Sequence, residues 1–212
     1  MSEQQRRTVS RWSVENVAVA LLAITAVLTA WSGFEASKWG GEMSIAFSRA
    51  STQRIEATRQ ATTAEAARAI DLQTFGIWLQ ATAEDDQVLA EFTRERFTEH
   101  FTPAFDEWLA ARPLKNPDAP PSPFALDTYA PPGQVEAQEA DARADEYFAD
   151  ALVDNRRGDN YTLLTVLFAL VLFFGALANR FDSVRRSWTV LAGAGVLLLF
   201  AVSLLAVFPK IV

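Results

Sequence analysis

Three long stretches without a charged residue constrain the fold of this 212-residue chain more than any other feature. They are residues 17–33 (VAVALLAITAVLTAWSG), 161–178 (YTLLTVLFALVLFFGALA) and 188–208 (WTVLAGAGVLLLFAVSLLAVF). On a helix that rises ~1.5 Å per residue, Trp12 and Trp31 stand about 28 Å apart, which matches a hydrocarbon core ~30 Å thick. Aromatic residues at the ends of the other two stretches suit the membrane interface. The sequence therefore predicts three transmembrane helices.

An alternative for the first stretch is a cleaved signal peptide, because arginines precede it. Its apolar run is longer than the ~7 to 15 residues usual for such peptides. Thr29, Ala30 and Trp31 also make a poor cleavage site. We therefore predict a retained anchor.

Positive charge in the short loops predicts the orientation, because loops rich in Lys and Arg face the cytoplasm. Three arginines precede the first span and three lie between the second and third: Arg6, Arg7, Arg11, Arg180, Arg185 and Arg186. An odd number of spans then places residues 34–160 and the C-terminus outside. This outer segment carries 12 Lys and Arg against 23 Asp and Glu, a net charge of −11. Such a charge repels nucleic acid and anionic headgroups, so we expect neither as a partner.

The outer segment begins with a proline-free region rich in Ala, Gln, Glu and Arg, which favours a long helix. Alanines recur there at positions that, with Gln53 and Gln60 between them, follow alternating steps of four and three, as in a heptad seam. The alanines of this seam are Ala46, Ala50, Ala57, Ala64 and Ala67, and Asp71 follows them in register. Two interpretations remain open: the seam packs against a returning helix of the same chain, or it forms a homo-oligomeric coiled coil.

Aromatic and apolar residues at helical spacing predict a compact helical head over residues 70–111. Glu84, Asp85 and Asp86 interrupt the pattern and suit the start of a new helix, where acids are favourable. Pro103 suits the first turn of another short helix.

A proline-rich arm follows the head. Residues 112–133 hold seven of the nine prolines, which disfavours both helix and central strand. One interpretation is a docking strap that lays Phe124, Leu126 and Tyr129 on a partner or on the head. The other is a stiff connection to the returning helix.

The fold class predicted is therefore an all-α integral membrane protein with three transmembrane helices. An extracytoplasmic helical hairpin and an aromatic-rich helical head lie between the first and second spans. The predicted segments are a cytoplasmic tail (1–14), span 1 (15–33), an outward stalk (34–69), the head (70–111), the arm (112–133), a returning stalk (134–160), span 2 (161–178), a cytoplasmic loop (179–187), span 3 (188–208) and an external C-terminus (209–212).

Little in the sequence points to catalysis. The chain has no Cys and one His, His100, and it lacks phosphate-binding, dinucleotide and nucleophile motifs. His100 with Glu99, Asp106 and Glu107, and the acids Asp141, Asp145, Glu146 and Asp150, are weak candidates for metal ligands. A solvated helix face explains both groups more simply. We expect no enzyme, no catalytic residue, no metal site and no cofactor.

The spans carry two further features. Gly193 and Gly195, with Ala192 and Ala194, form a patch suited to close helix packing within or between subunits. The three charge-free stretches hold no ionisable group, which argues against a pump or secondary transporter. Thr25, Thr29 and Ser32 are the residues expected to line a pore if subunits assemble around the first span.

Three segments carry a resemblance: FTPAFDEWLAARPLKNPDAPPSPFALDTY (101–129), WGGEMSIAFSRA near residue 39, and DNYTLLTVLFALVLFF from residue 159. With them the chain resembles a group of bacterial three-span membrane proteins of unknown function. The resemblance covers most of the chain and implies a bacterial cytoplasmic membrane and a three-span layout. It implies no activity and no site residues.

Three functional hypotheses follow. The leading one is a bacterial inner-membrane protein whose external hairpin is an interaction or assembly module, forming a homo-oligomer through the alanine seam and the Gly193 patch. A membrane or periplasmic protein is a further possible partner, and lipid surrounds the spans. The first alternative is a homo-oligomeric channel whose acidic exterior concentrates cations. The second is an extracytoplasmic sensor subunit that signals through a separate protein.

Overall fold

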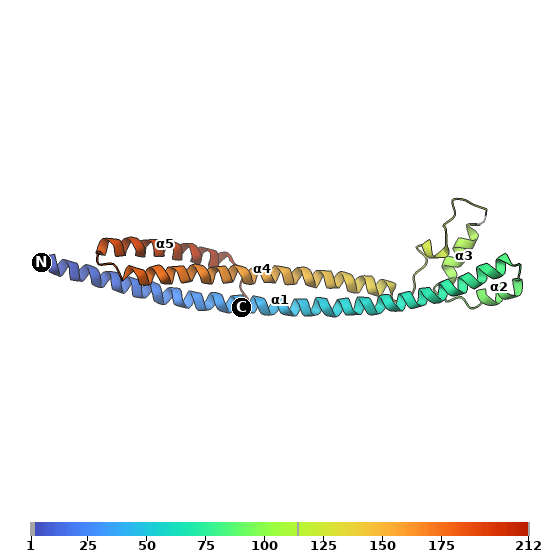
Figure 1. Ribbon diagram of the computed structural model, residues 1–212, viewed down its shortest axis with the longest axis horizontal. Coiled ribbons are helices and arrows are strands. Elements are labelled where there is room, and N and C mark those ends of the chain that lie inside the picture. The colour runs from blue at the N-terminus through green and yellow to red at the C-terminus, as the bar shows by residue number, and fades with distance from the viewer. Residues whose placement is uncertain (1–2, 114, 212) are drawn as a thin grey trace. The chain divides into compact units, whose positions relative to one another are not determined.

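A computed structural model describes residues 3–113 and 115–211, with side chains from Trp12 onward. The elements are α1 (Glu3–Ala83), α2 (Gln87–Arg94), α3 (Thr102–Ala110), the short 3-10 helix η1 (Pro123–Ala125), α4 (Gln134–Ala178) and α5 (Val184–Val207) (Figure 1). Within the described residues there is no strand, so the fold is all-helical as predicted. The side chains of Arg6, Arg7 and Arg11, on which part of the predicted orientation depends, lie outside the described residues.

Among the described residues, three helices are long and apolar enough to cross a membrane: α1 from Trp12, α4 and α5. This confirms the predicted number of candidate spans and indicates a multi-pass membrane protein. α1 and α4 also continue well beyond their apolar stretches, as single helices of 81 and 45 residues. The predicted limits of tail, span, stalk and head around residues 14, 33 and 69 therefore lie inside one helix. α5 begins at Val184, so Arg185 and Arg186 belong to its first turn and not to a loop.

The chain divides into two compact units, each described here by itself. The first, the membrane unit, extends up to Phe47 and resumes at Phe148, and it contains α5 and the apolar parts of α1 and α4. In it the three helices lie side by side (Figure 1). Its core is built around Trp39, Tyr161, Leu164 and Phe168, with Ala201 and Leu205 from α5. Gly158 lets α4 approach α1 closely. A Cβ at this position would lie 3.6 Å from the Ala36 carbonyl oxygen and from the Trp39 Cβ.

The second unit, residues 48–147, contains the end of α1, the start of α4 and everything between them. Ala50, Ala57 and Ala64 of α1 are buried, as are Ala140 and Ala144 of α4. These small side chains let the two helices pack closely. Gly133 precedes α4 with a φ of +91°, and a Cβ at this position would lie 2.6 Å from the Gln60 carbonyl oxygen. The turn into α4 therefore needs glycine both for its backbone conformation and for space.

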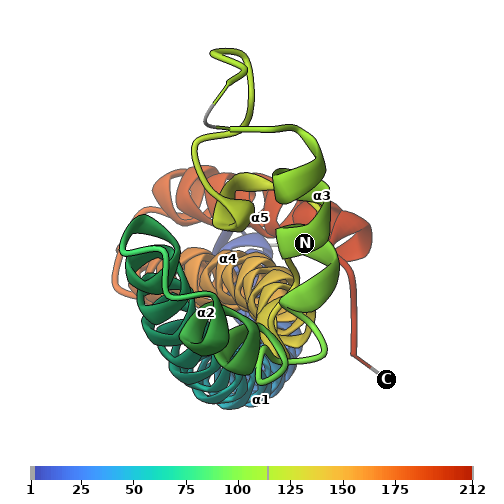
Figure 2. The same ribbon diagram turned by 90° about the vertical axis from the view of Figure 1, so that its right-hand side faces the viewer.

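The short helices start where the sequence predicts. Asp86 caps α2, because its side chain accepts a hydrogen bond of 3.0 Å from the Leu89 N–H. Pro103 lies in the first turn of α3. Helices α2 and α3 and the proline-rich arm lie at the same end of the second unit (Figure 2). Residues of α1, of the turn before α3, of α3 and of the arm form an aromatic cluster there.

Candidate functional site

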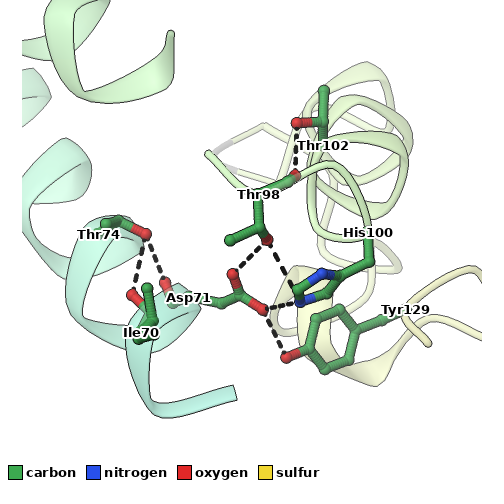
Figure 3. Close-up of polar contacts among 7 residues, drawn as sticks. All are labelled: Ile70, Asp71, Thr74, Thr98, His100, Thr102 and Tyr129. Carbon is green, nitrogen blue, oxygen red and sulfur yellow. Dashed lines mark hydrogen bonds and ion pairs between the residues drawn. The ribbon is translucent and has the colours of Figure 1, made fainter. Parts of the chain in front are cut away.

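The most distinctive polar site of the second unit is centred on Asp71, whose side chain is fully buried on α1. Its Oδ1 accepts a hydrogen bond of 2.5 Å from the Thr98 hydroxyl. Its Oδ2 lies 2.7 Å from His100 Nε2 and accepts a hydrogen bond of 2.9 Å from the Tyr129 hydroxyl (Figure 3). We call these four residues the Asp71 network. A buried carboxylate is tolerated when such donors replace the water that it loses.

The network joins three segments that are distant in sequence. Asp71 belongs to α1, Thr98 and His100 to the turn before α3, and Tyr129 to the proline-rich arm. Thr98 also helps to begin α3, because its carbonyl oxygen accepts a hydrogen bond of 2.9 Å from the Thr102 hydroxyl (Figure 3). The head and the arm are thereby tied to one position on α1.

The electrostatics of the network favour a protonated tyrosine. Burial raises the pKa of Tyr129, and the hydrogen bond to Asp71 and the negative charge of that residue raise it further. The hydroxyl therefore stays a donor to the carboxylate at neutral pH. His100 is the most accessible member, with 22% of its side chain exposed.

The geometry of His100 differs from that of a catalytic relay. In such a relay one ring nitrogen faces the carboxylate and the other faces the nucleophile. Here the same Nε2 faces both Asp71 and, at 3.3 Å, the Thr98 hydroxyl. The network is thus suited to holding segments together.

The arm residues singled out in the sequence lie against the head of the same chain. Phe124 and Leu126 pack on an aromatic cluster, and Tyr129 is buried within it. The cluster consists of Phe75, Trp78, Phe97, Phe101, Ala104, Phe105 and Trp108 with these three arm residues. Two further bonds fasten the arm: Trp108 Nε1 donates to the Pro120 carbonyl oxygen at 2.9 Å, and the Thr128 hydroxyl donates to Glu107 at 2.7 Å.

Helix α2 presents an apolar face to solvent. Val88 is 82% exposed and Phe92 51% exposed, and Leu89 lies beside them. Other positions hold α2 in place, because Thr93 is buried and Arg94 forms a salt bridge of 2.9 Å with Asp106 on α3. Elsewhere in this unit, Leu79 and Leu109 line an open pocket of about 290 Å³ with Trp78 and Trp108. The second unit therefore displays apolar surface on α2 and in this pocket.

The predicted assembly residues have different environments. The seam alanines Ala46, Ala50, Ala57 and Ala64 are buried, and Ala67 is partly buried. Arg54, between them, forms salt bridges of 2.5 and 2.6 Å with Asp141 and Asp145 of α4 in the same chain. At Gly193 and Gly195, by contrast, an added Cβ would meet no atom within 4 Å. The seam is thus occupied within the chain, whereas the glycine patch is open.

The predicted pore-lining residues lie on the inner side of the membrane unit. Thr25 and Ser32 are fully buried and Thr29 is partly buried. The hydroxyls of Thr25 and Thr29 donate to the carbonyl oxygens of Leu21 and Thr25, at 2.6 and 2.8 Å. These three residues face the neighbouring helices of their own chain.

The two acidic groups considered as metal ligands are engaged elsewhere. His100 contacts Asp71, Asp106 contacts Arg94, and Glu107 contacts Thr128. Among the residues that the structure describes, no group of three His, Asp or Glu side chains is placed to hold a metal ion.

Sequence reasoning did not identify Asp71 and Glu35 as site residues. A signal existed for each: Asp71 is the one charged residue in a seam of alanines and glutamines, and Glu35 follows Ser32 at helical spacing, just past the first charge-free stretch. Both side chains are fully buried. Comparisons with models of protein families, with curated proteins and with solved structures found no match.

Proposed function

We propose that this chain is a protein of the bacterial inner membrane whose extracytoplasmic segment, residues 34–160, is an interaction and assembly module without catalytic activity. Its N-terminus and the turn between α4 and α5 face the cytoplasm in this proposal. The positive charges flanking the spans support the orientation, since Arg180, Arg185 and Arg186 lie around that turn. The helical pair of α1 and α4 then carries the head outside the membrane.

The observation that carries the proposal is the exposed apolar face of α2, formed by Val88, Leu89 and Phe92. The aromatic cluster is closed without these side chains, so they are not needed to complete the head. Leaving large apolar side chains in water costs about 25 cal/mol per Å² relative to covering them. An exposed apolar face of this kind is typical of a surface that binds another protein.

We take the bound protein to be a second copy of this chain. The alanine seam packs inside the chain, so the contacts between copies are placed on the α2 face and on the patch around Gly193 and Gly195. Both glycines leave room for close approach of another helix. In this proposal each of the two surfaces joins one chain to another copy.

Disulfide cross-linking tests this proposal cleanly, because the native chain has no cysteine. Val88→Cys and Gly193→Cys each introduce one thiol at a proposed contact, and Ser51→Cys introduces one on an exposed part of α1 as a control. In membranes, oxidation should yield covalent dimers with the first two variants and far fewer with the control. Equal yields from all three would contradict the proposal.

The channel alternative predicts a different result. Purified protein in planar bilayers would conduct ions, and the conductance would fall when Thr25 or Ser32 is enlarged. Both residues are buried against helices of their own chain, which argues against a pore lined by the first span. Cross-linked oligomers without conductance would support the assembly module.

A further inference from the structure

A buried carboxyl group in the membrane unit has no role in the assembly proposed above. Glu35 lies on α1 just past the first charge-free stretch, and its side chain is fully buried. Its Oε2 accepts a hydrogen bond of 3.1 Å from the backbone N–H of Ile211. Its Oε1 has no hydrogen-bond partner among the described residues. An ionised carboxylate in an apolar environment is unfavourable unless a positive charge accompanies it.

Two neighbouring polar atoms share this lack of a hydrogen-bond partner. The Ser32 hydroxyl and Trp39 Nε1 are buried, and they too lack a partner within the described part of the chain. The three residues are spaced by three and four positions, so they follow one face of α1 on successive turns about 5 to 6 Å apart. We call this group the Glu35 site.

Unpaired buried polar atoms are rare in folded proteins, and three on one helix face form an unusual concentration. Ser32 contrasts with its neighbours on the same helix: Thr25 and Thr29 each donate to a carbonyl oxygen four residues earlier. The Ser32 oxygen has no such bond and remains free to act as a ligand.

The segment Pro209–Ile211 closes the site. The Tyr161 hydroxyl donates a hydrogen bond of 2.9 Å to the Pro209 carbonyl oxygen, and the Ile211 N–H binds Glu35. Ile211 and Phe208 pack on the hydrophobic core around Trp39 and Tyr161. The site is therefore enclosed by α1, α4 and this segment.

The cationic side chain next to the Trp39 ring has another partner. The Arg157 guanidinium lies 4.5 Å from the centre of the Trp39 ring and forms a salt bridge of 3.0 Å with Asp154. Asp154 thus balances Arg157, and the charge of Glu35 is left without a counter-ion among the side chains that contact it.

We propose that the Glu35 site binds one small monovalent metal cation, Na⁺ or K⁺. Glu35 Oε1 supplies the single negative charge, and the Ser32 hydroxyl supplies a neutral oxygen, the ligand type that hard cations prefer. Trp39 Nε1 donates to a water molecule that remains on the ion. One carboxylate balances one positive charge, whereas a divalent ion would leave an uncompensated charge in a medium of low dielectric constant.

The test uses the full chain in detergent, at constant ionic strength, in NaCl, KCl or choline chloride. The thermal unfolding midpoint should rise with Na⁺ or K⁺ and then saturate, because a ligand that binds only the folded state stabilises it. Choline is too large for the site and should have no such effect. Glu35→Gln should abolish the rise, whereas Glu42→Gln, which changes an exposed acid on the same helix, should preserve it.

Ser32→Ala provides a second test that keeps the carboxylate, in case Glu35→Gln does not fold. Loss of one oxygen should raise the cation concentration at half-saturation about tenfold or more. The proposal is overturned by an equal response to choline, by a cation response that persists in Glu35→Gln, or by an unchanged half-saturation in Ser32→Ala. It is also overturned if stability depends on pH but on neither metal cation, since the counter-charge would then be a proton.

Discussion

The Tyr129 hydroxyl donates a hydrogen bond of 2.9 Å to Asp71, although 58 positions separate the two residues in the chain. This contact joins the proline-rich arm to α1 inside a buried site. Because Asp71 also binds Thr98 and His100, one carboxylate holds the arm and the turn before α3 together. The position of the arm is therefore determined within the chain and needs no partner.

Tyr129→Phe should weaken the attachment of the arm to α1 and leave the packing of the aromatic cluster intact. The variant keeps the ring and removes one donor from a buried carboxylate, which costs about 1 to 3 kcal/mol. Hydrogen exchange of residues 120–130 should become faster than in the native chain. Tyr147→Phe is the control, because the Tyr147 ring lies 6.0 Å from the Arg49 guanidinium and keeps that contact. Unchanged exchange in the arm would show that this hydrogen bond does not hold it.

Tyr129 should also make the free energy of unfolding depend on pH in the alkaline range. Burial and Asp71 raise the pKa of Tyr129 in the folded state above the ordinary value of ~10. The contribution of this residue to stability is therefore complete below about pH 10 and is lost as the pH rises toward the folded pKa. Unfolding midpoints measured from roughly pH 8 to 11 should fall more steeply for the native chain than for Tyr129→Phe. Parallel curves would rule out this coupling.

Ala144→Leu tests the close approach of α1 and α4. Ala144 is fully buried, so four-carbon side chains do not fit there without moving a helix, at a cost of about 1 to 3 kcal/mol. Ala142→Leu adds the same atoms two residues away at an exposed position of the same helix. The melting temperature should fall for the first variant only. Similar melting temperatures would mean that the two helices are not closely packed at this point.

Gly133→Ala tests the turn into α4. Its φ of +91° disfavours any side chain, and the new Cβ would meet the Gln60 carbonyl oxygen at 2.6 Å. Strain of this kind costs of order 1 to 3 kcal/mol. Gly76→Ala, at an open position inside α1, should instead be neutral or stabilising by up to about 1 kcal/mol. The two variants should thus shift the thermal midpoint in opposite directions or by clearly different amounts.

The helices and their capping residues could be predicted because their signals are local. Charge-free runs of sufficient length indicate the candidate spans, and Asp86 and Pro103 mark helix starts through their own backbone chemistry. The seven-residue spacing of Ala50, Ala57 and Ala64 likewise indicates a buried stripe. Such patterns do not say which helix covers the stripe, so packing within the chain and packing between chains both stayed open.

The Asp71 network could not be predicted, because its members come from segments that no periodicity connects. His100 looked like a solvated residue since its neighbours in sequence are acidic, whereas its actual partner lies 29 positions away. Glu35 was missed for a different reason. It lies two residues past the end of the charge-free stretch, where the sequence gives little sign of burial. In the structure the buried face of α1 continues through Ser32, Glu35 and Trp39.

The central claim is that the chain assembles with copies of itself through the exposed face of α2 and the open patch on α5. The most direct measurement is the particle mass of the full chain in lipid nanodiscs, compared with that of Phe92→Glu and Gly193→Leu. Phe92 and Gly193 are both exposed, so these variants should fold. The account predicts an oligomer for the native chain and a smaller particle for each variant. A native chain that is monomeric, or variants that assemble as the native chain does, would contradict it.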